Sequence, residues 1–315
     1  MHLENAKFCE VWRSNMRRIG VYPEQYMITT DAPTSRSLRA RIPARECLGQ
    51  SLVYCVISQR ARGLSIGVNM NPDGLCNFDC VYCEVDRRKS SGDHNVDVAR
   101  MRLELDQVLD LAMTGRLRDL PPFHAAPADL LELKEVALSG DGEPTLCPNF
   151  REVIEGVAHV RAAGRWPFFK IVLITNGTGL QLPHVRSGIE ILTSYDEIWV
   201  KLDAGTQRGM DLVNRSDVRI ETVLENIVNL GKERPIVIQS LFPLLRGEEP
   251  LPEEIDAYLE RLKALHDAGA KIESIQVYSA HRPAIHPDCG HLPLKSLSKI
   301  ARRVRDETGL NAEVF

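Results

Sequence analysis

From residue 64 onward the chain alternates short β-branched runs with longer amphipathic stretches, and this order restricts the fold more than any other feature. Strands are expected at residues 64–70, 135–142, 169–177, 196–203, 235–242 and 274–280. Helices are expected at residues 96–117, 149–163, 182–192, 220–230, 252–269 and 293–309. Such an alternation produces a parallel sheet covered by helices. Six repeats predict an α/β fold, a partial (β/α)₆ TIM-type barrel whose active site lies at the C-terminal ends of its strands.

Residues 1–60 do not share this rhythm. They hold eight arginines against few acids, and three prolines interrupt them. We therefore expect two parts, an N-terminal extension at residues 1–60 that packs on the barrel and the barrel itself at residues 61–315.

Composition limits the class of protein. With 315 residues and 43% hydrophobic content, the chain can bury a large core. The formal net charge of -4 means that a nucleic-acid partner would have to bind a local basic patch. Eight cysteines are too sparse for a disulfide-stapled secreted scaffold. No run of about 18 apolar residues and no signal peptide is found, so we expect a cytoplasmic protein without membrane contact.

Three cysteines follow the first expected strand. Cys76, Cys80 and Cys83 form a C-x₃-C-x₂-C pattern. Iron–sulfur clusters are held by closely spaced thiolates, and a cubane 4Fe–4S cluster takes four ligands. This segment supplies three, so one iron would remain open to a ligand that is not protein. The alternative is a structural zinc site, which usually pairs its cysteines as C-x₂-C and needs a fourth ligand from elsewhere.

A glycine-rich segment follows the second expected strand. It reads Ser-Gly-Asp-Gly-Glu-Pro-Thr at residues 139–145. Gly140 and Gly142 let the backbone approach a ligand closely, and Glu143 supplies a carboxylate for an ammonium group. The alternative is an ordinary Gly-Asp-Gly turn.

Polar residues also close the later strands. Thr175 and Asn176 end the third, and Lys201 and Asp203 end the fourth, so all four are expected to point into the barrel mouth. An Asx turn or a helix cap is the alternative for any one of them. Weaker candidates at the fifth and sixth strands are Gln239, Ser240, Tyr278 and Ser279.

Together these motifs resemble the radical S-adenosylmethionine (radical SAM) family. Asp141 departs from the commonest glycine-rich form of that family, but the resulting G-x-G-E-P-T segment resembles the branch of the wyosine-forming tRNA enzymes. Residues 212–215, 275–284 and 308–315 resemble the same branch. The resemblance covers residues 58–315 and leaves the first part of the chain unaccounted for.

The resemblance implies a reaction and a set of ligands. A 4Fe–4S cluster on Cys76, Cys80 and Cys83 would bind S-adenosylmethionine at its open iron. An electron from the cluster would then cleave the cofactor to a 5′-deoxyadenosyl radical that abstracts hydrogen from a substrate. Glu143 would clamp the methionine amine, and Gly140 and Gly142 would allow the close approach. Further cofactor-binding positions implied are Tyr82 at the adenine, Asn176 at the ribose or carboxylate, and Lys201 and Asp203 at the cofactor or the substrate.

The resemblance also implies partners. An external one-electron reductant of the flavodoxin or ferredoxin type would be needed, and the cluster would make the protein oxygen-sensitive. The leading substrate is a nucleoside in tRNA, and the alternative is a small metabolite or a peptide. A regulatory protein that binds an iron–sulfur cluster without turnover is a further alternative.

Other reactive side chains have two interpretations each. Cys9, Cys47 and Cys55 would hold a second cluster or be ordinary buried thiols. His281, His286, Cys289 and His291 would form a metal site or a solvated loop. Cys147 is expected to be a small residue at a helix start. The basic run at residues 87–89 would track phosphates or form a solvated surface.

Overall fold

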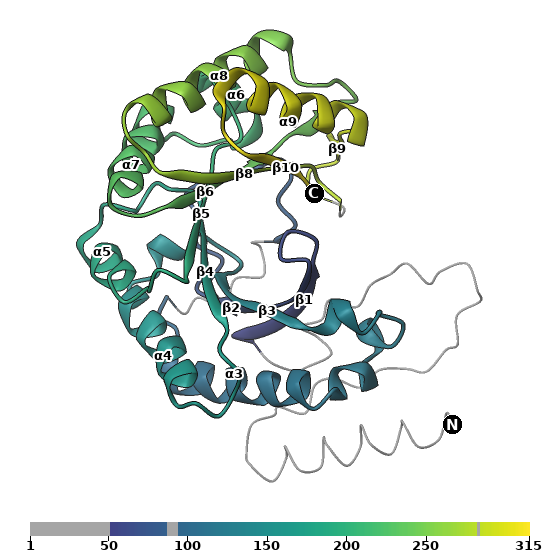
Figure 1. Ribbon diagram of the computed structural model, residues 1–315, viewed down its shortest axis with the longest axis vertical. Helices are drawn as coiled ribbons and strands as arrows, with labels where there is room; N and C mark the ends of the chain where they lie inside the picture. Colours follow the sequence, from purple (N-terminus) through teal and green to yellow (C-terminus); the bar gives the residue numbers. More distant parts are fainter. Residues whose placement is uncertain (1–50, 87–93, 282–283) are drawn as a thin grey trace.

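The structure, a computed structural model, describes residues 51–86, 94–281 and 284–315. Its main sheet has eight strands in the order β1-β2-β3-β4-β5-β6-β8-β10. The sheet curls through part of a circle, and the helices lie on its convex side (Figure 1). The predicted partial TIM-type α/β barrel is confirmed.

All six expected strands are present. They are β2 (Gly63–Asn69), β3 (Leu133–Ser139), β4 (Lys170–Thr175), β5 (Glu197–Lys201), β6 (Ile236–Leu241) and β8 (Ile272–Tyr278). Each pairs in parallel with the next along the sheet. The carboxyl ends of these strands therefore meet along one edge, as the alternation of strands and helices requires.

The expected helices are present as well. They are α3 (Val98–Met113), α4 (Phe150–Ala162), α5 (Pro183–Ile189), α7 (Ile220–Glu233), α8 (Pro252–Asp267) and α9 (Leu294–Thr308). A short helix that the sequence analysis does not predict, α6 (Gln207–Val213), begins at Thr206, whose side chain accepts a hydrogen bond from the Gly209 N–H. Short 3₁₀ helices occupy Arg116–Asp119, Pro121–Phe123, Asp129–Leu131 and Pro144–Leu146 (η5).

Two strands extend the sheet beyond the predicted set. β1 (Val53–Ser58) pairs antiparallel with β2, and β10 (Ala312–Val314) pairs in parallel with β8. β1 falls inside residues 1–60, whose assignment to a separate extension stays a prediction, since residues 1–50 lie outside the described residues. A separate two-stranded sheet joins β7 (Pro243–Leu245) to β9 (Cys289–His291).

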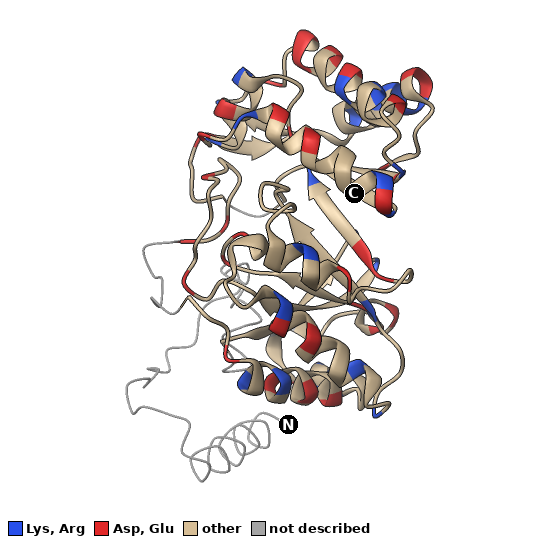
Figure 2. Cartoon of the chain, turned by 90° about the vertical axis from the view of Figure 1, so that its left-hand side faces the viewer, with Lys and Arg blue, Asp and Glu red and all other residues tan. Residues whose placement is uncertain are grey.

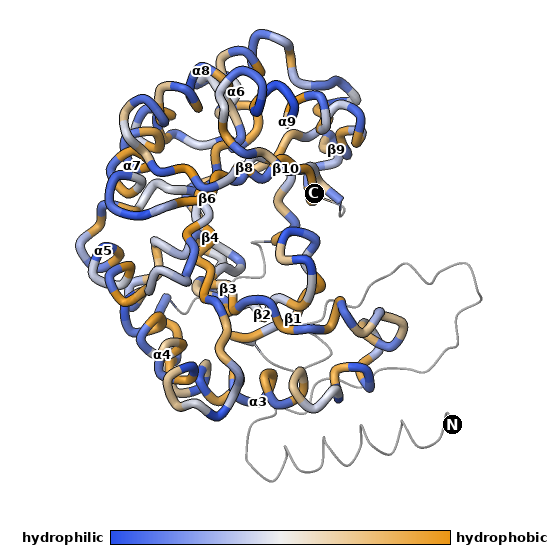
Figure 3. Tube along the Cα trace, in the orientation of Figure 1, coloured by the Kyte–Doolittle hydropathy of each residue, from blue (hydrophilic) through white to orange (hydrophobic). Residues whose placement is uncertain are grey.

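The two faces of the main sheet differ in chemistry. Most of the hydrophobic core lies between the strands and the helices, and Figure 3 shows the matching orange stretches along the strands. The opposite, concave face carries a small apolar cluster of Val172, Trp199 and Val237. Polar pairs flank it, such as Ser65 with Glu135 at 3.0 Å. The concave face is therefore built to contact polar groups as well as apolar ones.

The first hairpin closes on the last strands. In the hairpin turn between β1 and β2, the Arg60 guanidinium lies 4.5 Å from the centre of the Tyr278 ring. Arg62 forms an ion pair with Glu313 at 2.6 Å and lies 5.9 Å from the Phe315 ring centre. These contacts join the two edges of the open sheet.

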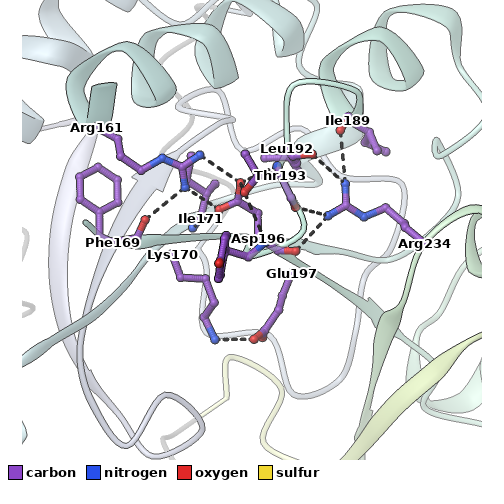
Figure 4. Close-up of polar contacts among 11 residues, drawn as sticks. Arg161, Phe169, Lys170, Ile171, Ile189, Leu192, Thr193, Asp196, Glu197 and Arg234 are labelled. Carbon is purple, nitrogen blue, oxygen red and sulfur yellow. Dashed lines mark hydrogen bonds and ion pairs between the residues drawn. The ribbon is translucent and has the colours of Figure 1, made fainter. Parts of the chain in front are cut away.

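A buried ion pair ties the opposite, N-terminal ends of β4 and β5 (Figure 4). The Arg161 guanidinium donates to both carboxylate oxygens of Asp196, at 2.6 and 3.1 Å. Asp196 also accepts from the Ile171 N–H and from Thr193, while Arg234 donates to the Asp196 carbonyl at 2.9 Å. Burial alone would raise the pKa of Asp196, but these donors lower it below its usual range.

Surface charge is mixed. In the view of Figure 2, lysines and arginines alternate with acids along the helices, and neither sign dominates. No helix among the described residues is both long and apolar enough to cross a membrane.

Candidate active site at the C-terminal ends of the strands

The cysteines lie in an irregular segment directly after β2, which we call the cysteine loop (residues 70–86). This loop touches the segment after β3, the glycine–glutamate loop (residues 140–143). The carbonyl of Leu75 accepts a hydrogen bond of 2.9 Å from the Glu143 N–H. A Cβ on Gly142 would lie 1.9 Å from the same carbonyl oxygen, so no larger residue fits there without moving the cysteine loop. The structure thus brings together two motifs that stand far apart in the sequence.

Gly140 makes a second close approach. Its φ of 147° is a conformation that favours glycine, and a Cβ there would lie 2.1 Å from Oδ1 of Asn69. The Asn69 side chain accepts from the Asp141 N–H at 3.0 Å and donates to the Asp141 carboxylate at 2.7 Å. Asn69, at the end of β2, therefore fixes the glycine–glutamate loop.

The three cysteines of the triplet lie within this loop. Cys80 is buried, whereas Cys76 and Cys83 are half-buried. The Phe78 N–H donates to the Cys76 sulfur at 3.4 Å, and Asn214 donates to the Cys80 sulfur at 3.4 Å. Burial has the largest effect and raises the pKa of the Cys80 thiol, and the negative charge of Asp203 raises it further. The hydrogen bond from Asn214 opposes this rise.

Helix α6 holds the cysteine loop in place. The backbone N–H groups of Asp79 and Val81 donate to the carbonyls of Asn214 and Val213, at 3.0 and 2.9 Å. This short pairing explains how an irregular loop keeps a defined shape.

A single metal ion and an iron–sulfur cluster require different arrangements of ligands. Among the described residues, no group of three or more His, Cys, Asp or Glu side chains is placed to hold one metal ion. Cysteines around a cubane bind different irons, so their sulfurs stand further apart than the ligands of a single ion do. The side-chain arrangement of the triplet is therefore compatible with a cluster.

Glu143 is buried, with 3% of its surface exposed, and it is richly hydrogen-bonded. Its Oε1 accepts from the N–H and hydroxyl of Thr145, at 3.0 and 2.7 Å, and from the Thr175 hydroxyl at 2.5 Å. Its Oε2 accepts from the Asn176 N–H at 2.7 Å. Burial raises the pKa of Glu143, and these four donors counteract the rise. The carboxylate therefore fastens the end of β4 to η5, a role that sequence reasoning did not predict.

Asn176 connects the same strand end to the cysteine loop. Its Nδ2 donates to Oδ1 of Asn77 at 2.8 Å, and its own Oδ1 accepts from the Thr178 N–H at 3.0 Å. The second contact is the Asx turn that the sequence analysis gave as the alternative. The first places Asn176 beside the triplet as well.

Tyr82, Lys201 and Asp203 form one network. The Tyr82 hydroxyl donates to the Asp203 carboxylate at 2.5 Å, and the Lys201 ammonium lies 4.8 Å from the centre of the Tyr82 ring. Lys201 also donates to the Tyr278 hydroxyl at 2.9 Å and lies 3.5 Å from Asp203. Burial would lower the pKa of Lys201, but Asp203, Tyr278 and Cys80 together outweigh this effect and raise the pKa. The amine is therefore charged at neutral pH.

The four weaker strand-end candidates do not all lie at the barrel mouth. Tyr278 joins the network through Lys201. Gln239 donates to Gln276 at 2.8 Å on the concave face. Ser240 bonds the Tyr258 hydroxyl at 2.6 Å, and Ser279 accepts from the Leu292 N–H at 2.8 Å, so both serve packing away from the mouth.

The other reactive side chains are not part of the triplet, although His286 lies against the cysteine loop, and His281, His286, Cys289 and His291 do not form a metal-ligand group among the described residues. Cys9, Cys47 and residues 87–89 lie outside the described residues. Cys55 and Cys147 are buried, and burial raises the pKa of each thiol to about 12. His281 and His291 stack with ring centres 4.5 Å apart, and His286 lies 3.5 Å from Asp79.

Asn214 is the functional candidate that sequence reasoning did not single out. It follows α6 and contacts Cys80, Tyr82 and Asp203 together. The only sequence signal was the resemblance of residues 212–215 to the wyosine-forming branch.

Comparison with known proteins finds relatives in sequence and solved structures of similar fold. No family model matches the chain. A UPF0026 protein of Synechocystis is 30% identical over 186 residues, 58% of this chain and 60% of that protein. A UPF0026 protein of Helicobacter pylori is 25% identical over 233 residues, 71% of this chain and 66% of that protein. The matches thus cover less than two thirds of each relative's own length.

Two solved structures are similar to this chain in fold. A mutant of spore photoproduct lyase superposes with a TM-score of 0.52 at 9% identity, covering 97% of this chain and 93% of that one. SuiB of Streptococcus suis, bound to the precursor peptide SuiA, superposes with a TM-score of 0.51 at 15% identity, covering 78% of this chain and 47% of that one. The chain shares the fold of these two structures. In this fold the cysteine triplet follows β2, the first parallel strand, and the motif resemblance is confirmed at the level of the fold.

Proposed function

We propose that the chain is a radical SAM enzyme whose 4Fe–4S cluster is held by Cys76, Cys80 and Cys83 and whose S-adenosylmethionine lies at the barrel mouth. The observation that carries this proposal is the contact between Leu75 and the glycine–glutamate loop. It sets the first cysteine beside the two glycines and the carboxylate that the cofactor would need.

The side chains present suit a cluster. Three cysteines share one loop, and backbone or amide N–H groups already donate to two of the sulfurs, those of Cys76 and Cys80. Such N–H···S bonds stabilise thiolates that bind iron. When bound, the cluster and S-adenosylmethionine would supply a 5′-deoxyadenosyl radical that takes hydrogen from the substrate.

The chain's own residues would bind and orient the cofactor. Oε2 of Glu143 accepts one hydrogen bond within the protein, whereas Oε1 accepts three. A carboxylate oxygen has two acceptor sites, so Oε2 is the oxygen that would receive the methionine amine. Tyr82, fixed by Asp203, would offer the adenine a backbone and ring surface, and Asn176 would reach the ribose or carboxylate. Gly140 and Gly142 would keep the approach open.

The test is anaerobic reconstitution of the whole chain with iron and sulfide, followed by dithionite and S-adenosylmethionine. We expect 5′-deoxyadenosine to form, and we expect Cys80→Ala to abolish both the cluster absorbance and the product. Cys147→Ala is the matched control, since that thiol is buried and donates to Asn149. A loaded cluster without any cofactor cleavage would instead support the regulatory protein.

The amine clamp has its own test. Glu143→Gln keeps the size of the side chain and the acceptor facing Thr145 and Thr175, but it removes the charge. We expect weaker binding of S-adenosylmethionine with an intact cluster, because a charge-assisted hydrogen bond contributes about 1.5–3 kcal/mol. Equal affinity in the variant and the parent would contradict the assignment.

The proposed substrate is a nucleoside in tRNA, on the strength of the motif resemblance. Adding bulk tRNA should increase 5′-deoxyadenosine formation, and no increase with an intact cluster would favour a small metabolite or a peptide. We further propose a flavodoxin- or ferredoxin-type reductant in the cytoplasm. Replacing dithionite with a reduced flavodoxin should sustain turnover.

A further inference from the structure

Asn214 donates from one amide nitrogen toward three acceptors. Its Nδ2 lies 2.8 Å from the Asp203 carboxylate, 3.3 Å from the Tyr82 hydroxyl and 3.4 Å from the Cys80 sulfur. The Asp203 carboxylate can only accept, so the amide nitrogen and not its oxygen must face it, and the two hydrogens of this nitrogen are shared among the three acceptors. The residue is 3% exposed, so water does not compete for these hydrogen bonds.

The position of Asn214 is fixed by backbone as well. Its carbonyl accepts from the Asp79 N–H at 3.0 Å, and its own N–H donates to the Met210 carbonyl at 2.8 Å. The side chain is therefore anchored to α6 on one side and to the cysteine loop on the other. Such anchoring keeps the N–H···S distance from drifting.

Two opposing influences act on the Cys80 sulfur. The Asp203 carboxylate disfavours negative charge there, whereas the Asn214 amide and the Lys201 ammonium favour it. Adding an electron to a cluster makes its sulfurs more negative. A donor aimed at a ligand sulfur therefore stabilises the reduced cluster, and hydrogen bonds to the sulfurs are a known determinant of cluster potential.

We propose that Asn214 is a positioning residue that raises the reduction potential of the cluster through its N–H···S bond to Cys80. The inference rests on the proposed function, because it requires a cluster at Cys80. In the step concerned, one electron passes from the external reductant to the cluster, and no bond of the protein forms or breaks. The Asp203 carboxylate holds Tyr82 in place, but its negative charge makes reduction of the cluster harder. The hydrogen bond from Asn214 offsets this effect.

The experiment is a redox titration of the full chain, reconstituted anaerobically and followed by the electron paramagnetic resonance signal of the reduced cluster. In Asn214→Ala, we expect the ratio of reduced to oxidised cluster at a fixed potential to fall about tenfold, since a hydrogen bond to a charged group is lost. For a one-electron couple a tenfold change corresponds to about 59 mV. Asn226→Ala is the matched control, because Asn226 is also a buried asparagine but donates to the carbonyls of Gly177 and Thr178.

The outcomes separate this inference from the proposed function. A parent chain that assembles no four-iron cluster overturns both. A parent cluster whose potential is unchanged in Asn214→Ala overturns the role of Asn214 alone. If Asn214→Ala takes up too little iron, Asn214→Leu keeps a similar side-chain size without the N–H donor and without added charge, and is titrated instead. An unchanged potential there, or failure of both variants to assemble a cluster, also overturns the inference.

Discussion

The Glu143 N–H donates to the carbonyl of Leu75 at 2.9 Å, so the loop after β3 holds the residue that precedes the first cysteine of the triplet. The hydrogen bond joins two backbone groups, so it does not depend on the side chains of either loop. Displacing one loop must therefore displace the other. This coupling gives the first prediction.

Gly142→Ala should impair cluster assembly. The added methyl group would lie 1.9 Å from the Leu75 oxygen, and backbone there cannot give way as a flexible side chain would. We expect less iron and sulfide per chain after reconstitution, measured chemically and by visible absorbance. Gly164→Ala serves as the control, because its φ of 66° makes it strained although no atom lies within 4 Å of the new Cβ. The control should lose about 1–2 kcal/mol of stability and keep its cluster.

Glu143→Ala should destabilise the fold before any cofactor is considered. The mutation leaves the buried donors of Thr145, Thr175 and Asn176 without an acceptor. Buried donors left unsatisfied cost about 1–3 kcal/mol, so we expect the free energy of unfolding of the cluster-free chain to fall by about 3 kcal/mol. Denaturant titration measures it. A variant as stable as the parent would show that these hydrogen bonds do not stabilise the strand end.

Cys55→Ala should leave the iron content of the reconstituted chain unchanged, at about four atoms per chain. The Cys55 thiol is wholly buried on β1 within the hydrophobic core, so no space for a cluster lies beside it. Iron analysis of the variant and the parent checks this. A loss of several iron atoms would instead support the second cluster with Cys9 and Cys47.

The Arg161–Asp196 pair should make stability depend on pH. The folded-state pKa of Asp196 lies below its usual value, so its contribution is complete above about pH 3.9 and is lost as pH falls through the lower folded value. At pH 7, Asp196→Ala should cost about 3–5 kcal/mol, because Arg161 is left buried without its partner.

Denaturant titrations at several pH values test this dependence. The difference in unfolding free energy between the parent and Asp196→Ala should shrink in acid. Asp267→Ala, at an exposed position, should show little difference from the parent at any pH. A constant gap between the parent and Asp196→Ala down to pH values below about 3.9 would refute the assigned pKa direction.

Much of the fold follows from the sequence because the periodic elements are long and local. The cysteine loop and the glycine–glutamate loop could be placed at the ends of β2 and β3 for the same reason. The flanking strands β1 and β10 could not be predicted in this way. β10 has only three residues, and β1 pairs antiparallel with β2 and belongs to residues 1–60, which are rich in arginine. A three-residue strand carries too little alternation to be distinguished from a loop.

The side-chain contacts of the site could not be predicted from the sequence to the same extent. Glu143 bonds Thr175 and Asn176, which follow it by more than thirty residues, only because β3 and β4 are neighbours in register. Asn214 reaches Cys80 across 134 residues. Such partners depend on how α6 packs, and residue type and spacing do not determine that.

The contacts of Arg60 and Arg62 with the last strands have a consequence for biosynthesis. Arg62 and Glu313 are separated by 251 residues, so this closure is among the most non-local contacts of the chain. During translation the hairpin and the cysteine loop emerge early, while β10 emerges after every other strand of the sheet. Non-local contacts of this kind form late in folding. The growing polypeptide would thus present its thiols beside an open sheet edge for most of its synthesis, leaving an interval in which iron–sulfur assembly could precede closure.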